Sequence, residues 1–474
     1  MRRSRIIRQI VYSGLLLTTP FLASATGEEP HAHLPNVLFV YTDDQALWSI
    51  GAYGHGEAKT PNLDRLVREG AIFRNAFTVT PVCSPSRASM MTGRYPTRIG
   101  IDDWINPRTE PNLGLAPSEL LWPEVVRSAG YETMLLGKWH LGTLDAFHPT
   151  RQGYVDFFGF RDGGNRPIDP RIEVKGTVKQ LGGSLPDLLV DQGLKFLESQ
   201  RKRPFVLSVH FRAPHAPYAP VPEVDSSVYR DLDPAVPDVK GLPVARVKSL
   251  RREYYASVHS IDRNVGRLLD ALDRLGLAKD TIVIASSDHG YMIGQHGLWH
   301  KGNATWLVKG KSGPRPNMFD DAIRVPLIVR WPGTVAPGSS VEKVVSNLDI
   351  FPTVLEMTGL GVPPKHAIDG RSFVPLLKQD ASAASAWDDT LIGQYDMHHT
   401  KVARMRMIRT PEWKLIRHFE PGVRDELFHL ASDPGETIDL IDAPEHHGRL
   451  ASLRAELHRR LAAIQDPLAD AARP

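Results

Sequence analysis

The only cysteine among the 474 residues lies in surroundings suited to chemistry. Cys83 is followed by Ser84-Pro85, a pair typical of a helix start, because serine caps a helix and proline favours its first position. The unpaired N–H groups and the dipole at a helix start attract anions. A lone cysteine cannot form a disulfide within its own chain. Cys83 is therefore either an inert buried thiol or a reactive group, and its position favours the reactive group.

Other residues capable of chemistry follow short apolar runs that are typical of buried strands. These runs lie at residues 36–41, 133–136, 205–210 and 281–285. In chain order they lead into Asp43-Asp44, Lys138 with His140, His215, and Asp288-His289. Ligands of parallel α/β sheets bind beyond the carboxyl ends of the strands. We therefore expect one site to gather these side chains.

The three carboxylates of this set point to a metal ion. Asp43, Asp44 and Asp288 offer hard oxygen ligands, which suit Ca²⁺ or Mg²⁺ better than zinc. Each acidic pair alone is as typical of a helix cap or a solvated turn, and His215 or Lys138 alone could be an ordinary surface residue. Their expected meeting at one edge of a sheet is what favours a divalent cation site.

The elements that must position these residues alternate between strands and helices. Residues 254–275 keep one helical face apolar, and a shorter helix starts at Pro61. This alternation predicts an α/β fold with a large, mostly parallel sheet flanked by helices. We expect it to span residues 33–378.

A change of pattern predicts a second, smaller unit. Residues 379–388 are rich in alanine and serine and are expected to be a linker. Beyond them, a hairpin turning at residues 410–412, a short strand and a closing helix predict a C-terminal α+β subdomain over residues 389–474.

The first 25 residues have the features of a secretory signal peptide. Four arginines precede an apolar run at residues 10–22, and Ala23-Ser24-Ala25 is typical of a cleavage site. An uncleaved membrane anchor is the alternative, but the run is short and is interrupted at residues 18–20. We expect a periplasmic or secreted protein without stable membrane insertion.

Composition restricts the class of partner. The chain is 42% hydrophobic, as is usual for a globular protein, and its net charge is +3. It has no long basic run, so nucleic acid is not an expected partner.

Six motifs in chain order resemble the type I sulfatase family of the alkaline phosphatase superfamily. They are Asp43-Asp44, Cys83 to Arg94, Gly137 to Gly142, Pro214 to Pro217, Asp288 to Gly290, and His296 to Lys301. The most specific is Cys-x-Pro-x-Arg followed by Thr-Gly-Arg. The resemblance extends from Asn36 to the closing helix. It implies that a maturation enzyme oxidises Cys83 to formylglycine, an aldehyde whose hydrate is the nucleophile.

The resemblance also implies one divalent cation, with calcium expected. Its ligands would be Asp43, Asp44, Asp288, His289 and the modified Cys83. His289 stands where the family often has asparagine, and imidazole is a less usual ligand for calcium.

The remaining roles concern the sulfate group and its protons. Arg87 would hold the hydrated aldehyde, and Asp288 would take a proton from it, so that its oxygen attacks sulfur. Lys138 and Lys301 would bind sulfate oxygens. His215, with Lys301, would protonate the leaving group. His140 would remove the second proton, which releases sulfate and restores the aldehyde.

Substrate recognition is expected at three places. Residues 302–318 depart from the family pattern and are either a loop that shapes the substrate site or a plain surface excursion. Residues 102–106 and 395–399 are rich in side chains that bind sugars. Within the last group, we expect His398 and His399 to contact substrate.

The leading interpretation is a sulfuric ester hydrolase that removes sulfate from a sulfated carbohydrate or a related sulfate ester. Two alternatives stay open. One is a phosphonate monoester or phosphodiester hydrolase of the same superfamily. The other is a non-catalytic protein that binds sulfated glycans.

Overall fold

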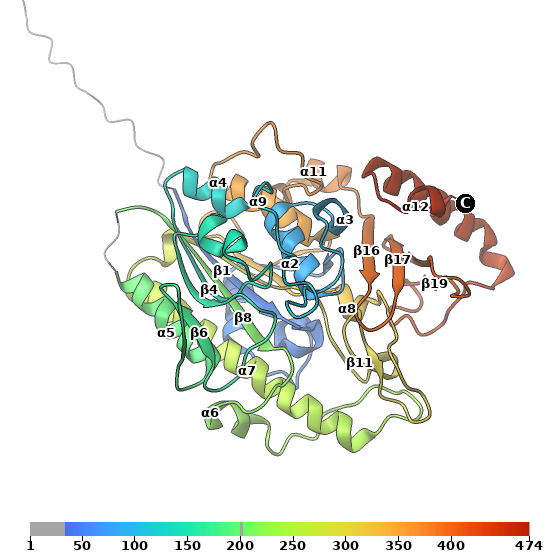
Figure 1. Cartoon of the computed structure of the whole chain (residues 1–474), viewed down its shortest axis with the longest axis horizontal. Helices are drawn as coiled ribbons and strands as arrows, with labels where there is room; N and C mark the ends of the chain where they lie inside the picture. Colours follow the sequence, from blue (N-terminus) through green and yellow to red (C-terminus); the bar gives the residue numbers. More distant parts are fainter. Residues whose placement is uncertain (1–33, 200–201, 474) are drawn as a thin grey trace, which may run out of the picture. The chain divides into compact units, whose positions relative to one another are not determined.

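A ten-stranded sheet dominates the structure, a computed structural model that describes residues 34–199 and 202–473 (Figure 1). The strand order is β14-β2-β13-β9-β1-β8-β4-β5-β6-β7. The five central strands run parallel: β9 (Thr281–Ser287), β1 (Asn36–Asp43), β8 (Phe205–Pro214), β4 (Glu132–Lys138) and β5 (Asp156–Phe160). The predicted α/β fold with a mostly parallel sheet is confirmed. The expected signal peptide, residues 1–25, lies outside the described residues.

Short strands complete the two edges of this sheet. They are β13 (Leu327–Arg330), β2 (Ala71–Phe73) and β14 (Ser339–Val341) on one side, and β6 (Arg171–Val174) and β7 (Thr177–Gln180) on the other. Strands β13, β6 and β7 run antiparallel to their neighbours.

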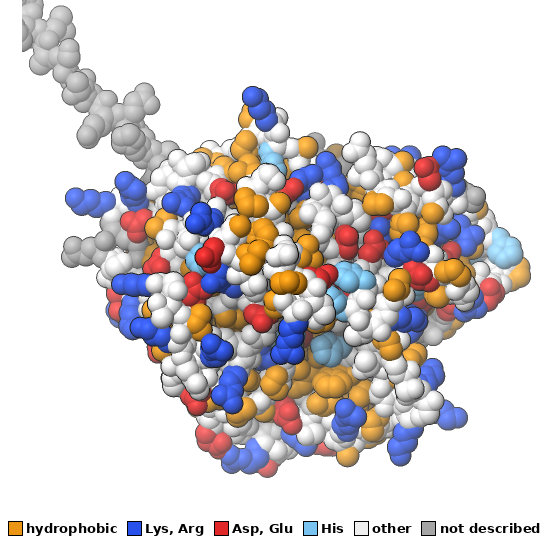
Figure 2. All heavy atoms as spheres, in the orientation of Figure 1, with side chains coloured by type: hydrophobic (Ala, Val, Ile, Leu, Met, Phe, Trp, Pro, Cys, Tyr) orange, Lys and Arg blue, Asp and Glu red, His pale blue; other side chains and the backbone are white. Residues whose placement is uncertain are grey.

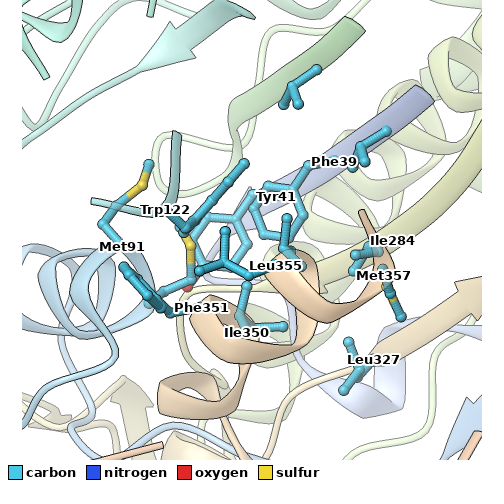
Figure 3. Packing of buried hydrophobic residues seen from close by; sticks show 14 of the residues in the cluster. Phe39, Tyr41, Met91, Trp122, Ile284, Leu327, Ile350, Phe351, Leu355 and Met357 are labelled. Atoms are coloured by element: carbon cyan, nitrogen blue, oxygen red, sulfur yellow. The ribbon is translucent and has the colours of Figure 1, made fainter. Parts of the chain in front are cut away.

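Helices cover both faces of the sheet, so the alternating side chains of β1 enter two separate cores. Phe39 and Tyr41 pack with Met91, Trp122 and Phe351 (Figure 3). These partners come from α2 (Cys83–Thr92), α4 (Trp122–Ser128) and α9 (Ile350–Met357). Leu38 and Val40 face the other core, built with α1 (Pro61–Glu69), α5 (Leu185–Glu198) and α7 (Val244–Arg274). The central strands are thus buried on both sides.

A second, antiparallel sheet follows near the C-terminus. It contains β16 (Leu391–Met397), β17 (Ala403–Arg409), β18 (Trp413–His418) and β19 (Glu426–His429). The closing helix α12 (His447–Ala463) packs on one face of it through its leucines. The predicted hairpin, strand and closing helix are confirmed. The segment expected as a linker contains the short helix α11 (Ala381–Ala386), and the domain boundary there stays a prediction.

A small sheet of β10 (Met292–Ile293), β11 (Leu298–His300) and β12 (Thr305–Trp306) follows the end of β9. In the part of the chain that the structure describes, no helix is both long and apolar enough to cross a bilayer.

A buried charge cluster joins the second sheet to the helix α8 (Asp320–Ile323). Lys414 Nζ lies 2.5 Å from Asp320 Oδ1 and 2.5 Å from Glu436 Oε1. Arg409 Nη2 lies 2.8 Å from Asp320 Oδ2. Asp320 therefore neutralises two cations that have been removed from water, and the junction depends on its carboxylate.

We predict that Asp320→Ala destabilises the protein by about 3–5 kcal/mol, because it leaves Lys414 and Arg409 buried without their shared partner. Urea unfolding followed by circular dichroism measures the change. Asp321→Ala is the matched control, because this neighbouring carboxylate is partly exposed and lies 3.5 Å from His296 Nε2. Equal losses of stability in the two variants would contradict the assignment.

Candidate active site

Four central strands of the large sheet deliver the predicted residues to one place. Asp43 ends β1, Lys138 ends β4, His215 follows β8, and Asp288 with His289 follows β9. The fold thus brings together the side chains that the sequence placed at separate strand ends.

The helix α2 brings Cys83 to the same place. The helix starts at Cys83, with Val82 as the flanking residue, so the expectation that Ser84 caps it is wrong by two residues. The Ser84 hydroxyl instead accepts a hydrogen bond from the backbone N–H of Ile105 at 2.9 Å. Since α2 is buried along its whole length, Cys83 is fixed at the positive end of a helix.

The environment of the Cys83 thiol favours negative charge. The residue is 4% exposed. Burial alone would raise the pKa of the thiol, but the charges of Lys138 and Lys301 bring the pKa below its usual value. A group at this position therefore experiences a positive potential.

Three buried ion pairs line the site. Lys138 Nζ lies 2.5 Å from Asp43 Oδ2, and Lys301 Nζ lies 2.6 Å from Asp44 Oδ1. In the third pair, Arg87 Nη2 lies 3.0 Å from Asp288 Oδ2, and Arg87 Nε donates to the same oxygen at 3.0 Å. Every side chain in these pairs is at most 3% exposed. Each carboxylate thus has a cation of its own.

The three carboxylates differ in their affinity for protons. Burial would raise the pKa of Asp43, but Lys138 holds that pKa well below its usual range. Burial acts on Asp44 in the same way, and Lys301 lowers its pKa. For Asp288, burial and the neighbouring charge of Asp43 raise the pKa. Asp288 is therefore the carboxylate best prepared to accept a proton.

The residues at the centre fit a divalent cation. One ligand atom from each of Asp43, Asp44, Asp288 and His289 lies within 4.8 Å of the others. Asp43 Oδ1 and Asp44 Oδ2 are buried and have no hydrogen-bond partner among the described residues. His289 Nδ1 lies 3.0 Å from the carbonyl oxygen of Gly290, which can only accept, so Nδ1 carries the hydrogen and Nε2 keeps a lone pair. This donor set suits a hard cation with one imidazole ligand.

The hydrogen bonds of the other two histidines fix their tautomers. His140 Nε2 donates to the Ile105 carbonyl at 3.0 Å, which leaves Nδ1 free to accept a proton. His215 Nδ1 donates to the Ala216 carbonyl at 2.7 Å, which leaves Nε2 facing Asp44 Oδ2 at 3.9 Å. Burial lowers the pKa of each imidazole to about 3. Both rings are therefore neutral near pH 7.

Gly302, the first residue of the insert at residues 302–318, packs against the segment that leads into α2. The backbone N–H of Gly302 donates to the carbonyl of Pro81 at 3.1 Å. A Cβ on Gly302 would lie 2.2 Å from the Pro81 ring, so only glycine fits here. This contact holds Lys301 close to the segment that leads into Cys83.

The two groups expected to recognise substrate lie side by side. The His399 ring packs on Trp104 with a centroid distance of 4.5 Å, and the backbone N–H of His398 donates to Asp103 Oδ2 at 2.9 Å. Asp103 itself is buried and braces the loop. His398 and His399 remain partly accessible, and Figure 2 shows histidine side chains near a hollow at the centre of the viewed face.

Sequence reasoning missed two residues of this region. Glu110 binds both histidines, with its carboxylate oxygens 2.9 Å from His398 Nε2 and 3.1 Å from His399 Nε2. Tyr254 looked like one more apolar position of a helix. Its hydroxyl donates to the carbonyl of Asp44 at 2.5 Å and accepts from the N–H of Ala46 at 2.9 Å. It thereby supports the left-handed backbone of Asp44, whose φ is 70°.

Comparisons with known proteins identify the family of this chain. The family model of the sulfatases matches residues 35–360, and that of the C-terminal part of N-sulphoglucosamine sulphohydrolase matches residues 314–466. N-acetylgalactosamine-6-sulfatase of Rattus norvegicus is 31% identical, covering 86% of this chain and 81% of its own length. N-acetylglucosamine-6-O-sulfatase of Bacteroides thetaiotaomicron is 26% identical over 92% of this chain and 88% of its own length.

Solved structures share the fold. One was determined with its substrate D-glucosamine-2-N,6-O-disulfate and has a TM-score of 0.80 at 23% identity, covering 92% of this chain and 99% of its own. The phosphonate monoester hydrolase of Agrobacterium radiobacter has a TM-score of 0.70 at 22% identity, covering 89% of this chain and 96% of its own. At such identities the likeness concerns the fold alone, whereas the family match favours sulfate ester hydrolysis over both alternatives. The chain belongs to the sulfatase family and is a sulfuric ester hydrolase.

Proposed function

We propose that this enzyme removes sulfate from a sulfated carbohydrate, using Cys83 in its formylglycine form and one calcium ion. The observation that carries the proposal is the convergence of the Cys83 end of α2 with three carboxylates, His289 and two lysines. Hydrated formylglycine beside a divalent cation would supply an activated oxygen nucleophile for attack on sulfur.

The charge balance of the site supports sulfate binding. Asp43, Asp44 and Asp288 are matched by Lys138, Lys301 and Arg87. A divalent cation held by the carboxylates and His289 leaves the pocket with net positive charge. Lys138 and Lys301 can then donate to the oxygens of an anionic sulfate ester. The same excess of charge disfavours neutral esters.

Proton transfers are assigned from the pKa shifts and tautomers. Asp288 accepts the proton of the nucleophile, and Arg87, whose Nη2 lies 3.0 Å from Asp288 Oδ2, orients that carboxylate and the nucleophile. His215 presents the Nε2 lone pair toward the site. The negative charge of a bound sulfate favours uptake of a proton there, and His215, with Lys301, then delivers that proton to the leaving oxygen or nitrogen. His140 presents Nδ1 and accepts the second proton of the nucleophile, the step that releases sulfate.

A carbohydrate substrate is supported by the group of His398, His399, Glu110 and Trp104, which we call the rim of the site, and by the names of the relatives. His398 and His399, held by Glu110 and Trp104, offer polar and flat surfaces suited to a sugar ring. Relatives named N-acetylgalactosamine-6-sulfatase and N-acetylglucosamine-6-O-sulfatase point to the same class of substrate. A periplasmic or secreted location, and a maturation enzyme that converts Cys83, belong to this proposal.

Replacing the nucleophile tests the central claim. Cys83→Ala is expected to abolish turnover of sulfate esters while the circular dichroism spectrum stays unchanged, because only one small buried side chain is lost. Mass spectrometry of the tryptic peptide from Asn75 to Arg87 should reveal the aldehyde in the active enzyme. Substantial activity in the variant would show that another group is the nucleophile.

The metal site predicts stabilisation by a cation. At calcium concentrations 100-fold above the dissociation constant, the folded state should gain about 2.7 kcal/mol of stability. The measurement is the rise in thermal unfolding temperature when calcium is added to protein from which a chelator has removed metal ions. Asp44→Asn should remove most of that rise. Asp103→Asn should keep it, because Asp103 belongs to a separate group with His398 and His399. A rise lost only in Asp103→Asn would place the cation at the rim.

The role of His215 predicts a dependence on the leaving group. His215→Asn should lower kcat for a sugar sulfate by roughly 10²–10⁴, because the departing alkoxide then lacks its acid. The loss for 4-nitrocatechol sulfate should be much smaller, because that leaving group is stable without a proton. Steady-state kinetics with both substrates measures the difference. Equal losses on both would argue that His215 positions other groups instead.

A further inference from the structure

A cavity of about 440 Å³ lies next to the site and is lined mainly by the loop that follows β5. It lies between the end of β5 and the hairpin of β6 and β7. Three arginines line it, Arg161, Arg166 and Arg171, together with the acids Asp162 and Glu173. Basic side chains are visible over β6 in Figure 2.

This cavity shares a wall with the active site. The backbone N–H of His140 donates to the carbonyl of Arg161 at 3.1 Å. Two residues later, Gly163 lies against the His140 ring so closely that a Cβ there would be 2.5 Å from Nε2. The loop that lines the cavity therefore packs directly against His140.

Asn165 fixes the two outer arginines next to each other. Its Oδ1 accepts from the backbone N–H of Arg166 at 2.9 Å and from that of Arg171 at 3.1 Å. Its Nδ2 donates to the carbonyl of Arg171 at 2.7 Å. The loop is thus built so that positions 166 and 171 stay together.

The charges lining the cavity are unequally matched. Arg161 is held by Asp145 at 2.8 Å and by Glu173 at 3.0 Å. Glu173 also bonds His148 at 2.9 Å, so its charge is already shared. Within residues 34–199 and 202–473, neither Arg166 nor Arg171 has an acidic side chain within 4.0 Å. Asp162, the other lining acid, accepts from the N–H of Gly163 at 2.6 Å.

We propose that Arg166 and Arg171 form a second anion subsite, which binds a sulfate or carboxylate group on the same glycan whose sulfate ester is cleaved. Two guanidinium groups match the planar or tetrahedral oxygens of such anions. The preferred substrate is then a glycan with several anionic groups. This inference rests on the proposed carbohydrate sulfatase function.

Calorimetry in a Cys83→Ala background tests the subsite without turnover of the ligand. The probes are a sulfated heparin-derived tetrasaccharide and the neutral chitotetraose. Arg166→Ala/Arg171→Ala should weaken binding of the sulfated probe roughly tenfold, the sum expected for two exposed ion pairs. Binding of chitotetraose should not change.

The matched control is Lys175→Ala/Lys179→Ala, which removes two exposed charges from the same β6–β7 hairpin outside the cavity lining. It should leave the affinity for the sulfated probe nearly intact. Equal weakening by the two double variants would overturn the subsite in favour of a general electrostatic effect, and no weakening by either would also overturn it. Because the readout is binding, a wild-type enzyme that hydrolysed no sulfate ester would refute the proposed function while this comparison still decided the subsite.

Discussion

The pairing of each active-site carboxylate with its own buried cation is the constraint on which the site depends. Asp43, Asp44 and Asp288 are buried within a few ångströms of one another, an arrangement that mutual repulsion and lost hydration would otherwise make unfavourable. Lys138, Lys301 and Arg87 offset both costs. Within residues 34–199 and 202–473, the same cations leave one oxygen of Asp43 and one of Asp44 without a hydrogen-bond partner. The charges of the site therefore balance in the folded protein, and two carboxylate oxygens can still bind a ligand.

The sheet explains why these pairs can form from distant parts of the chain. Lys138 and Asp43 end strands that are separated only by β8 in the sheet order. Since both faces of the central strands are covered by helices, their polar groups must emerge at the strand ends. Lys301 and Arg87 are exceptions. Lys301 comes from the irregular chain after β11 and is held by Gly302 against Pro81, and Arg87 comes from the helix α2.

Residues that could be predicted from the sequence share a local signal. The parallel strands are recognisable in the sequence as apolar runs, and the acids and histidines follow at the ends of these runs. Glu110 carries no such signal, because its histidine partner His398 lies 288 positions away. Tyr254 occupies a regular position on an apolar helix face. There the sequence pattern does not distinguish a tyrosine that forms hydrogen bonds from an aromatic residue that only packs. The start of α2 was misplaced because Ser84 has a competing partner in Ile105, which only the fold supplies.

The contact between Gly163 and His140 has a consequence for how this enzyme can diverge. Gly163 is needed for want of space and not for an unusual backbone angle, so any side chain there must displace the imidazole or the loop. Surface loops usually tolerate insertions and substitutions. In this loop Gly163 cannot be replaced without displacing His140, whereas the arginines before and after it can be exchanged. Selection for a new glycan would therefore vary the charges of the loop while conserving its path.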